Sequence, residues 1–508
     1  MVKNLAKVYS AELEGINAKL IEVEVDLNVG LHAFNIVGLA DKALNEAKER
    51  VNSALKNSGI KPPNRENRKI TINLAPADIK KTGSQYDLAI AVGYLLATKQ
   101  IAEFETKNKI FIGELALDGR LRPVSGALNI AEMAHEKGFK YLFLPSENAN
   151  EAAVIKGINI VALDTLEDAI EILEERKTLR PAIFKDSPPR ENSAPDFSEI
   201  KGQENAKRAL AIAASGGHNL LMIGPPGVGK SMLAQALVAI LPELSFAEAV
   251  ETTKVYSAAG LSQSGLMKER PFRSPHQTAS IAAIIGGGTQ PKPGEISLAH
   301  RGVLFLDELP EFQKNILEAL RQPLEAGSVH VARAKSSIVF PAKFTLVSAM
   351  NPCPCGFYGD PEKECRCSAY EVIKYQKKIS GPLLDRIDLQ IKVPRVKIAE
   401  LREKKYREPV SKKIKKDVEA ARKIQDRRFK KLKIKTNAEM SSKQAEEFAA
   451  LDASAEKFLA TLDKTRLSPR GYYRLLKTGR TIADLEAKEQ VSAEHLAEAF
   501  SYRLREEI

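Results

Sequence analysis

Gly224-Pro-Pro-Gly-Val-Gly-Lys-Ser231 follows the apolar run 220–223 and decides the fold of this 508-residue chain. Its glycines let the backbone wrap so that successive N–H groups point at phosphate oxygens, and the helical pattern from Ser231 places a helix N-terminus at the same anion. The lysine adds a charge on the β and γ phosphates, and the serine hydroxyl ligates magnesium. The stretch therefore predicts a site for ATP and Mg²⁺. The predicted nucleotide-binding residues are Gly224, Pro225, Pro226, Gly227, Val228, Gly229, Lys230 and Ser231.

Two further apolar runs end in polar residues that suit phosphate chemistry. The run at 303–306 ends in Asp307 and Glu308, and the run at 344–350 ends in Asn351. Asp307 can hold Mg²⁺ together with Ser231, and Glu308 can orient and polarise the water that attacks the γ phosphate. The Asn351 amide can hydrogen-bond both that phosphate and the water. These residues predict that the chain hydrolyses ATP.

The chain is too long for a single core, and its sequence divides into four segments. Residues 1–178 open with alternating strands, followed by a helical pattern from Asp41 to Asn57, and predict an α+β domain. Residues 179–195 contain four prolines among charged and small polar residues, as a linker does. In residues 196–396 helices alternate with apolar strands, which predicts an α/β P-loop domain with a parallel sheet. From 397 to 508 the apolar residues recur at helical spacing, and we expect a helical lid.

The net charge of +12 is concentrated in one stretch. Between Arg402 and Lys435 there are 16 Lys or Arg against 5 Asp or Glu. Such a basic stretch beside an ATPase motor indicates a polyanionic partner, most simply nucleic acid, although a solvated helix face explains it equally well. The sequence shows neither a run long enough to span a bilayer nor a secretory signal, so we expect a cytoplasmic protein that does not interact with membranes.

All four cysteines lie within fifteen positions, as two Cys-x-Cys pairs. Four thiolates can surround a tetrahedral Zn²⁺ and close an otherwise loose loop after Asn351. The spacing is tighter than the usual Cys-x₂-Cys, so reduced thiols without metal and a redox role stay open as alternatives. The predicted zinc ligands are Cys353, Cys355, Cys365 and Cys367.

Two long segments resemble the magnesium-chelatase-type clade of AAA+ ATPases. They read ERPFRSPHQTAS at 269–280 and GGGTQPKPGEISLAHRGVLFLDE at 286–308. In that clade a β-hairpin precedes the strand that ends at Asn351, and residues 328–340 match it. Related hairpins line the pore of helicases, so the resemblance makes Arg333 and Lys335 candidates for contacts with a phosphate backbone.

The same resemblance assigns two arginines. Arg386 lies in GPLLDRIDL at 381–389, the motif that supplies an arginine finger to a neighbouring subunit. Arg470 lies in SPRGYYR at 468–474 and matches the second sensor, with Arg466 and Arg474 as alternatives. Both roles require an oligomer or a closed lid, and a guanidinium delivered this way spreads charge onto the transferring phosphate.

The first segment resembles the proteolytic domain of Lon proteases through APADIKKTGSQYDLAIA at 75–91 and GELALDGRLRPVSGAL at 113–128. On that pattern the nucleophilic serine falls on Gln85 and the activating lysine on Leu128. A carboxamide cannot act as the nucleophile and a leucine cannot accept its proton, and a displaced nucleophile at Ser84 would still lack this base. The resemblance implies a domain that binds or assembles and does not cleave peptides.

Taken together, an inactive Lon-like domain, a chelatase-type motor with Asn351-Pro-Cys-Pro-Cys-Gly and a helical lid resemble the YifB/ComM family of bacterial ATPases. Members of that family are associated with natural transformation. The resemblance implies a hexameric ring that binds branched or single-stranded DNA and drives its branch migration as a helicase. The alternative is a metal-chelatase-type ATPase that remodels a protein partner. Gln85 and Leu128 argue against an ATP-dependent protease.

Overall fold

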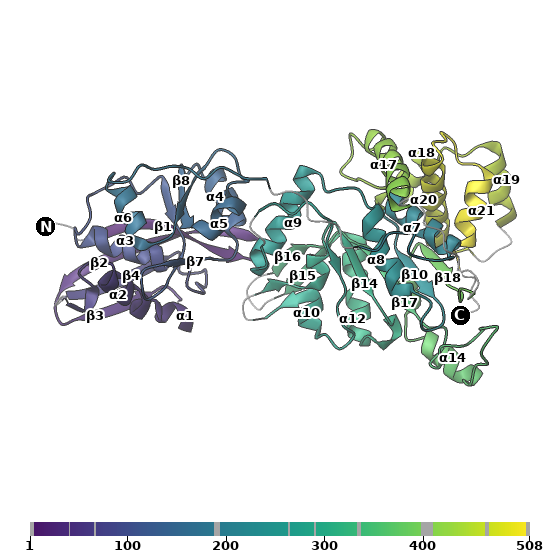
Figure 1. The fold of residues 1–508 in the computed structure, drawn as a ribbon, viewed down its shortest axis with the longest axis horizontal. Coiled ribbons are helices and arrows are strands. Elements are labelled where there is room, and N and C mark those ends of the chain that lie inside the picture. Colours follow the sequence, from purple (N-terminus) through teal and green to yellow (C-terminus); the bar gives the residue numbers. More distant parts are fainter. Residues whose placement is uncertain are drawn as a thin grey trace.

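The computed structural model describes residues 5–39, 41–65, 68–186, 194–262, 265–288, 291–332, 337–397, 410–462 and 467–503. The N-terminal unit occupies one end of the molecule, a parallel-sheet unit lies in the middle, and the C-terminal helices lie at the other end (Figure 1).

A seven-stranded mixed sheet forms the centre of the N-terminal unit, in the order β3-β4-β2-β1-β5-β8-β9. On β2 the side chains of Ile21, Val23 and Val25 are fully buried and alternate with partly exposed acidic residues, so the predicted alternation is confirmed. The strands are β1 (Leu5–Glu14), β2 (Asn17–Val29), β3 (Ala33–Val37), β4 (Arg68–Ala75), β5 (Lys109–Phe111), β8 (Tyr141–Pro145) and β9 (Asn159–Leu163), beside a small hairpin of β6 (Glu114–Leu115) and β7 (Leu121–Arg122).

Helices cover this sheet, and α3 is buried along nearly its whole length. The sequence predicted one helical pattern from Asp41 to Asn57, whereas the structure has two helices that meet at Glu46. The first is capped by Asp41, whose carboxylate accepts the N–H of Leu44 at 2.8 Å. The helices are α1 (Lys42–Asn45), α2 (Ala47–Asn57), α3 (Asp87–Ala97), α4 (Ala127–Glu136), α5 (Ser146–Ala152) and α6 (Leu166–Leu173).

The middle unit is built on a five-stranded sheet in the order β11-β14-β17-β10-β18, in which all neighbouring strands are parallel. The short strands β10 and β14 are buried at every residue, as strands covered on both faces must be. The strands are β10 (Leu220–Ile223), β11 (Phe272–Arg273), β14 (Val303–Leu306), β17 (Thr345–Met350) and β18 (Leu389–Lys392). This is the mixed α/β fold, with a parallel P-loop sheet, that the sequence predicted.

Helices and hairpins fill the connections of this sheet. The predicted hairpin is present as β15 (Ser328–Ala332) paired with β16 (Ser337–Pro341). A smaller hairpin pairs β12 (Gly286–Gly287) with β13 (Lys292–Pro293). The helices are α7 (Glu204–Gly216), α8 (Lys230–Ile240), α9 (Phe246–Ala259), α10 (Ile281–Ile285), α11 (Glu295–Leu298), α12 (Lys314–Ala319), α13 (Arg321–Ala326), α14 (Ala369–Gln376) and α15 (Gly381–Leu384).

The described C-terminal residues are helical, as predicted, and share one hydrophobic core with the parallel sheet. Val418, Leu475 and Leu496 belong to the same buried cluster as Leu210 and Leu233 of the middle unit. The helices therefore cannot move as a whole against α7 and α8 without breaking this core. They are α17 (Val410–Arg428), α18 (Ser442–Ala449), α19 (Ala453–Leu462), α20 (Pro469–Leu485) and α21 (Ala493–Ser501).

The N-terminal and middle units meet where α4 packs on α9. Ser257 of α9 donates to the buried carboxylate of Glu151, and its carbonyl accepts the N–H of Gly126 at 2.9 Å. The Asn129 side chain donates to the carbonyl of Ile16 at 2.6 Å and to that of Lys254 at 3.3 Å. Buried polar groups of the two units thus satisfy one another, which fixes their relative position.

Among the helices of the described ranges, none combines the length and the apolar character that a bilayer-spanning helix needs.

Candidate ATPase site

The predicted phosphate cradle is a loop between β10 and α8, at the carboxyl edge of the parallel sheet. Gly229 directly precedes α8 and has a φ of +87°, a conformation that residues with a Cβ rarely adopt. No heavy atom lies within 4 Å of the position that a Cβ at Gly229 would take, so the space in front of the helix N-terminus is open. This geometry leaves backbone N–H groups directed at an anion there.

Lys230 lies folded back into its own loop. Its Nζ donates to the carbonyls of Gly224 at 2.6 Å and Pro225 at 2.9 Å, and to Asn351 Oδ1 at 3.1 Å. Burial lowers the pKa of the Lys230 ammonium to about 8, against the opposing effect of the carboxylates of Asp307 and Glu308. A triphosphate would offer this ammonium stronger, charged acceptors than the three neutral oxygens.

A hydroxyl and a carboxylate meet beside the lysine. Ser231 Oγ donates to Asp307 Oδ2 at 2.8 Å, and the other Asp307 oxygen accepts the N–H of Glu308 at 2.9 Å. Glu308 has a left-handed backbone, with a φ of 50°, which turns the chain away from β14 at this point. Serine and aspartate oxygens are the protein ligands that Mg²⁺ takes in phosphate sites, so the donor set fits that ion.

The three strand ends meet because their strands are neighbours in the sheet. β17 pairs with both β10 and β14, and the residues that follow these three strands lie along one edge. The structure therefore brings Lys230, Ser231, Asp307, Glu308 and Asn351 into one group. This group can bind a magnesium–triphosphate complex and place a carboxylate and an amide near its terminal phosphate.

The four cysteines form one cluster after Asn351. Their sulfur atoms all lie within 4.8 Å of one another, and Cys353 Sγ lies 3.4 Å from Cys355 Sγ and 3.6 Å from Cys365 Sγ. Zn–S bonds of about 2.3 Å in a tetrahedron place sulfur atoms about 3.8 Å apart, so the cluster fits this ion. A hydrogen bond from the N–H of Arg366 is the main cause that lowers the pKa of the Cys355 thiol to about 6.

Arg386 and Arg470 lie away from the cradle of their own chain. Arg386 precedes β18, whose first residue, Leu389, pairs with Leu220 at the start of β10, whereas the cradle follows the end of β10. Both arginines line an open cavity of about 670 Å³ at the amino edge of the sheet. From the sequence, we expected these arginines to reach a phosphate either through a closed lid or in an oligomer. In the described structure Arg470 is turned to this cavity, and it forms an ion pair with Glu325 at 3.6 Å.

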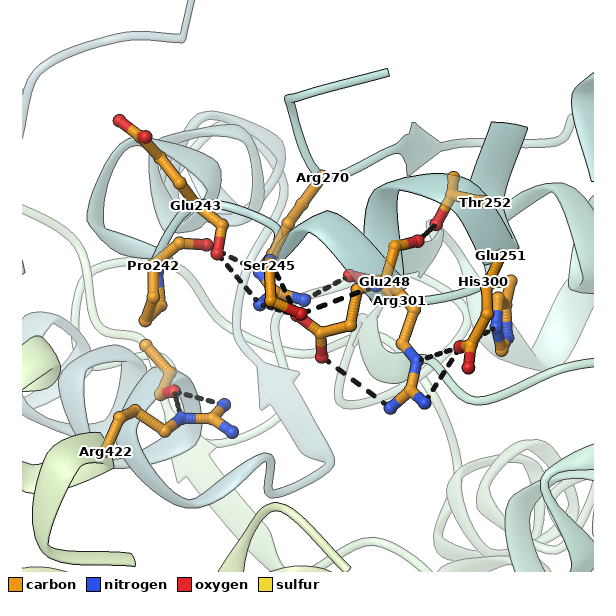
Figure 2. A network of polar contacts seen from close by, with 11 residues as sticks. Pro242, Glu243, Ser245, Glu248, Glu251, Thr252, Arg270, His300, Arg301 and Arg422 are labelled. Carbon is orange, nitrogen blue, oxygen red and sulfur yellow. Dashed lines mark hydrogen bonds and ion pairs between the residues drawn. The ribbon is translucent and has the colours of Figure 1, made fainter. Parts of the chain in front are cut away.

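The wall of this cavity is a network of ion pairs, drawn in Figure 2. The partly buried Arg270 donates to the carbonyls of Pro242 at 2.6 Å and Arg301 at 2.7 Å, and to Glu248 at 3.3 Å. Arg301 in turn pairs with Glu248 and with Glu251, and the hydrogen bond from His300 is the main cause that lowers the pKa of Glu251 to about 2. Arg422 of α17 lies in the same view and donates twice to the carbonyl of Ala214. The contacts of Arg270, Glu248 and Arg301 tie α9 to the amino edge of the sheet, and the separate contact of Arg422 ties α17 to α7.

Sequence reasoning missed the acidic partner of the two arginines. Glu325 lies on α13, contacts Arg386 as well as Arg470, and carries no motif of its own. The pattern of hydrophobic and polar residues in the sequence gives no sign of this contact, because the contact joins segments that meet only in the folded chain. The candidate DNA contacts Arg333 and Lys335 and the part of the basic stretch at 402–409 lie outside the described residues.

The protease-like positions of the N-terminal unit are engaged in other contacts. Gln85 Nε2 donates to Glu12 Oε2 at 3.2 Å, and Ser84 Oγ donates to Glu114. Leu128 is fully buried on α4, at the seam with the middle unit. Burial is the main cause that raises the pKa of Glu12, a residue for which the sequence gave no functional signal.

Comparisons with known proteins identify the family of this chain. Three family models match the chain: magnesium chelatase, subunit ChlI, at residues 196–401; subunit ChlI of Mg-chelatase at 23–148; and the ChlI C-terminal model at 408–503. Competence protein ComM of Haemophilus influenzae is 45% identical over 98% of this chain and 97% of its own. Uncharacterized protein YifB of Escherichia coli is 42% identical over the same shares. The chain belongs to the YifB/ComM family.

A narrower similarity connects this YifB/ComM-family chain to chelatases. The magnesium-chelatase 38 kDa subunit of Rhodobacter capsulatus is 33% identical over 31% of this chain and 50% of its own. The family relationship confirms that the chain is an ATPase of the AAA+ type, which uses ATP and Mg²⁺.

Proposed function

We propose that this chain is a ring-forming, hexameric ATP-driven motor that moves DNA, with branch migration of joined DNA molecules as its reaction. The observation that carries the ring is the separation of the two arginines from the cradle. Among the contacts of the described residues, none joins an arginine to Lys230, Ser231, Asp307 or Asn351. A second copy that docks its amino edge onto this cradle would supply Arg386 and Arg470.

In this proposal each residue at the cradle has one task. Lys230 and the backbone of 224–231 bind the phosphates, Ser231 and Asp307 bind Mg²⁺, and Glu308 orients the attacking water while Asn351 contacts both the water and the γ phosphate. Arg386 and Arg470 of the neighbour stabilise the charge that develops on the transferring phosphoryl group. A trans arginine of this kind is worth roughly 10³ to 10⁵ in rate in other systems.

A cavity of about 450 Å³ is lined by residues of the segment 197–211 and by the start of α17, and in this proposal it holds the base of the nucleotide. Ile200, Gly202 and Ile414 line it together with polar residues. Gln203 lies between the lining residues Gly202 and Glu204, and its side chain donates to the carbonyl of Pro394 at 2.6 Å. The residue before Pro394 is Val393, whose backbone lies against Gly224 of the cradle.

The exposed lysines of α17 and the name of one relative both support DNA as the partner. On α17 and the loop after it, Lys412, Lys413, Lys416 and Lys430 are exposed, whereas Arg428 pairs with Asp484 inside the protein. These exposed lysines, which belong to the basic stretch of the sequence, can neutralise phosphates. The Haemophilus relative is named a competence protein, which also favours DNA.

The same proposal includes a structural Zn²⁺ and an N-terminal domain without protease activity. The four cysteine sulfur atoms lie within 4.8 Å of one another, close enough to share one ion, and Gly356 of their loop lies against Pro226 of the cradle. The Gln85 carboxamide and the Leu128 side chain cannot perform acyl transfer. We assign the N-terminal unit, residues 1–178, to binding or assembly, joined by residues 179–195 to the ATPase domain (196–396) and the lid (397–508).

The test is ATP hydrolysis by the purified protein with no DNA, single-stranded DNA, duplex and a four-way junction, at one fixed salt concentration. We expect the junction to stimulate turnover most, Lys230→Ala to lose nucleotide binding, and Glu308→Gln to bind ATP with hardly any turnover. Native mass spectrometry with ATP gives the number of subunits, for which we expect six.

A second candidate function is a chelatase-type ATPase that remodels a protein partner, favoured by the 33% identity to the 38 kDa subunit. Turnover that is indifferent to all four DNA conditions would reject the DNA motor and favour this candidate. A matched pair of variants separates the two further. Lys412→Ala/Lys413→Ala/Lys416→Ala should weaken DNA stimulation and its salt dependence, whereas Lys42→Ala/Lys48→Ala/Lys56→Ala in the N-terminal unit should leave both unchanged.

A further inference from the structure

Glu325 lies between the two arginines that line the amino-edge cavity. Its Oε1 atom pairs with Nη2 of Arg386 and with Nη2 of Arg470, the latter at 3.6 Å. The Arg386 side chain is only 9% exposed, whereas Glu325 is 54% exposed. One carboxylate oxygen, open to solvent on one side, therefore serves two guanidinium groups.

Arg386 has little else to bind in the described structure. Its Nη1 donates to the carbonyl of Pro382 at 2.5 Å, and its buried Nε has no partner among the described residues. The guanidinium is thus held by one backbone oxygen and by Glu325.

We propose that Glu325 is a positioning residue for ATP hydrolysis. In an isolated subunit it holds Arg386 and Arg470 together, and on assembly it releases them to the triphosphate of the neighbouring subunit. This inference rests on the proposed function, in which the two arginines act in trans. Without a shared anion, two guanidinium groups at this distance repel each other. With Glu325 in place they stay adjacent, so that one terminal phosphate can engage both.

The release follows from the charges of the two ligands. Carboxylate and phosphate offer the guanidinium the same kind of bidentate acceptor, so they are alternative partners. A carboxylate left beside the γ phosphate would place two anions together, which is unfavourable. Because Glu325 is half exposed, its side chain can turn to water when the phosphate arrives. Glu325 therefore competes with ring assembly while it keeps the arginines in place.

The test is the ATPase rate per subunit as a function of subunit concentration, for the full-length protein with saturating ATP. Removing the competing charge in Glu325→Gln should lower the concentration for half-maximal rate by about fivefold, as expected for one partly exposed ion pair. It should leave kcat within about twofold, because in the assembled ring the terminal phosphate replaces Glu325 as the anion that the two arginines share. Glu325→Asp should behave as the unmodified protein. Glu325→Ala should shift the midpoint in the same direction as the glutamine variant, which guards against a folding artefact of either one.

Glu318→Gln is the matched control, since its carboxylate pairs with Arg321 at 2.7 Å on a neighbouring helix. An unchanged midpoint in both Glu325→Gln and Glu325→Ala would overturn the inference. So would a large loss of kcat at an unchanged midpoint. Full activity of Arg386→Ala, or a rate per subunit that does not depend on concentration, would instead overturn the trans arrangement itself, so the two failures are distinguishable.

Discussion

Gly356 of the cysteine loop lies directly against Pro226 of the phosphate cradle. A Cβ added at Gly356 would come within 2.7 Å of Pro226 Cδ, and Gly356 has a φ of +86°, where only glycine is free of strain. The loop that holds the four sulfur atoms thus supports the outer turn of the nucleotide site. Any change in the loop should be felt by the bound phosphates.

We predict that Gly356→Ala weakens ATP binding by about tenfold, equivalent to about 1.4 kcal/mol, because the new methyl group must displace Pro226. The dissociation constant is measured with a fluorescent ATP analogue. Gly359→Ala is the control, since Gly359 has a φ of +74° in the same loop but no heavy atom within 4 Å of its added Cβ. Equal dissociation constants for the two variants would show that backbone strain alone, and not contact with the cradle, is responsible.

The pKa of Lys230 makes nucleotide binding pH-dependent. Burial lowers this pKa to about 8, so the ammonium loses its proton as the pH rises through 8 in the free protein, while bound phosphates favour the charged form. Binding above this pH then requires proton uptake, and we expect the ATP dissociation constant to be steady at pH 7, to begin to rise near pH 8 and to be clearly higher at pH 9. In Lys230→Arg the guanidinium stays charged, so the rise should disappear. A rise of the same size in that variant would assign the titration to another group.

The lowered pKa of Lys230 has the opposite effect on the stability of the folded chain, which it increases as the pH rises. Between pH 8 and the ordinary lysine value of 10.5 the unfolded chain binds more protons at this residue than the folded chain does. The Lys230 contribution to the free energy of unfolding therefore increases with pH over that window. Weaker ATP binding at high pH thus cannot be ascribed to unfolding caused by this residue.

The fold could be predicted from the sequence wherever the pattern was local. Runs such as Val303–Leu306 are short and wholly apolar, and alternation on β2 reveals a strand with one buried face. Because parallel strands end at one edge, the order of the polar residues after them also indicated a common site. The single helix expected from Asp41 to Asn57 was wrong in detail, since periodicity alone does not show the interruption at Glu46.

Contacts between residues far apart along the chain could not be predicted from the sequence. Glu325 of α13 meets Arg386 and Arg470 only in the folded chain. The two arginines lie in motifs that the sequence reveals, whereas Glu325 alone reads as an ordinary surface charge. Likewise, nothing local marks Ser257 as the partner of Glu151, 106 residues earlier. Such pairs depend on how whole units pack, which apolar periodicity and turn residues do not encode.

The position of the two arginines predicts complementation between subunits. Arg386→Ala should lower kcat by about a thousandfold and still bind ATP, because the cradle of its own chain is intact. Lys230→Ala should be inactive for the opposite reason. When the two inactive proteins are mixed, the Arg386 of a Lys230→Ala subunit can serve the cradle of an Arg386→Ala subunit, so ATPase activity should return in part. Arg321→Ala, which removes an exposed ion pair with Glu318, should leave the rate unchanged. A mixture as inactive as its components would contradict action in trans.

The seam between the N-terminal and middle units predicts a difference between two buried serines. Ser257 Oγ donates to Glu151, whose buried carboxylate otherwise accepts the N–H of Leu128 at 3.1 Å. Ser257→Ala removes a hydrogen bond to a buried charged group, and we expect it to reduce the free energy of unfolding by about 1.5–3 kcal/mol. Ser10 is equally buried, but its hydroxyl finds no partner among the described residues, so Ser10→Ala should be neutral or slightly stabilising. Denaturant unfolding followed by circular dichroism compares the two variants. Equal effects would mean that the Ser257–Glu151 contact does not hold the two units together, because the only chemical difference between the substitutions is the lost hydrogen bond.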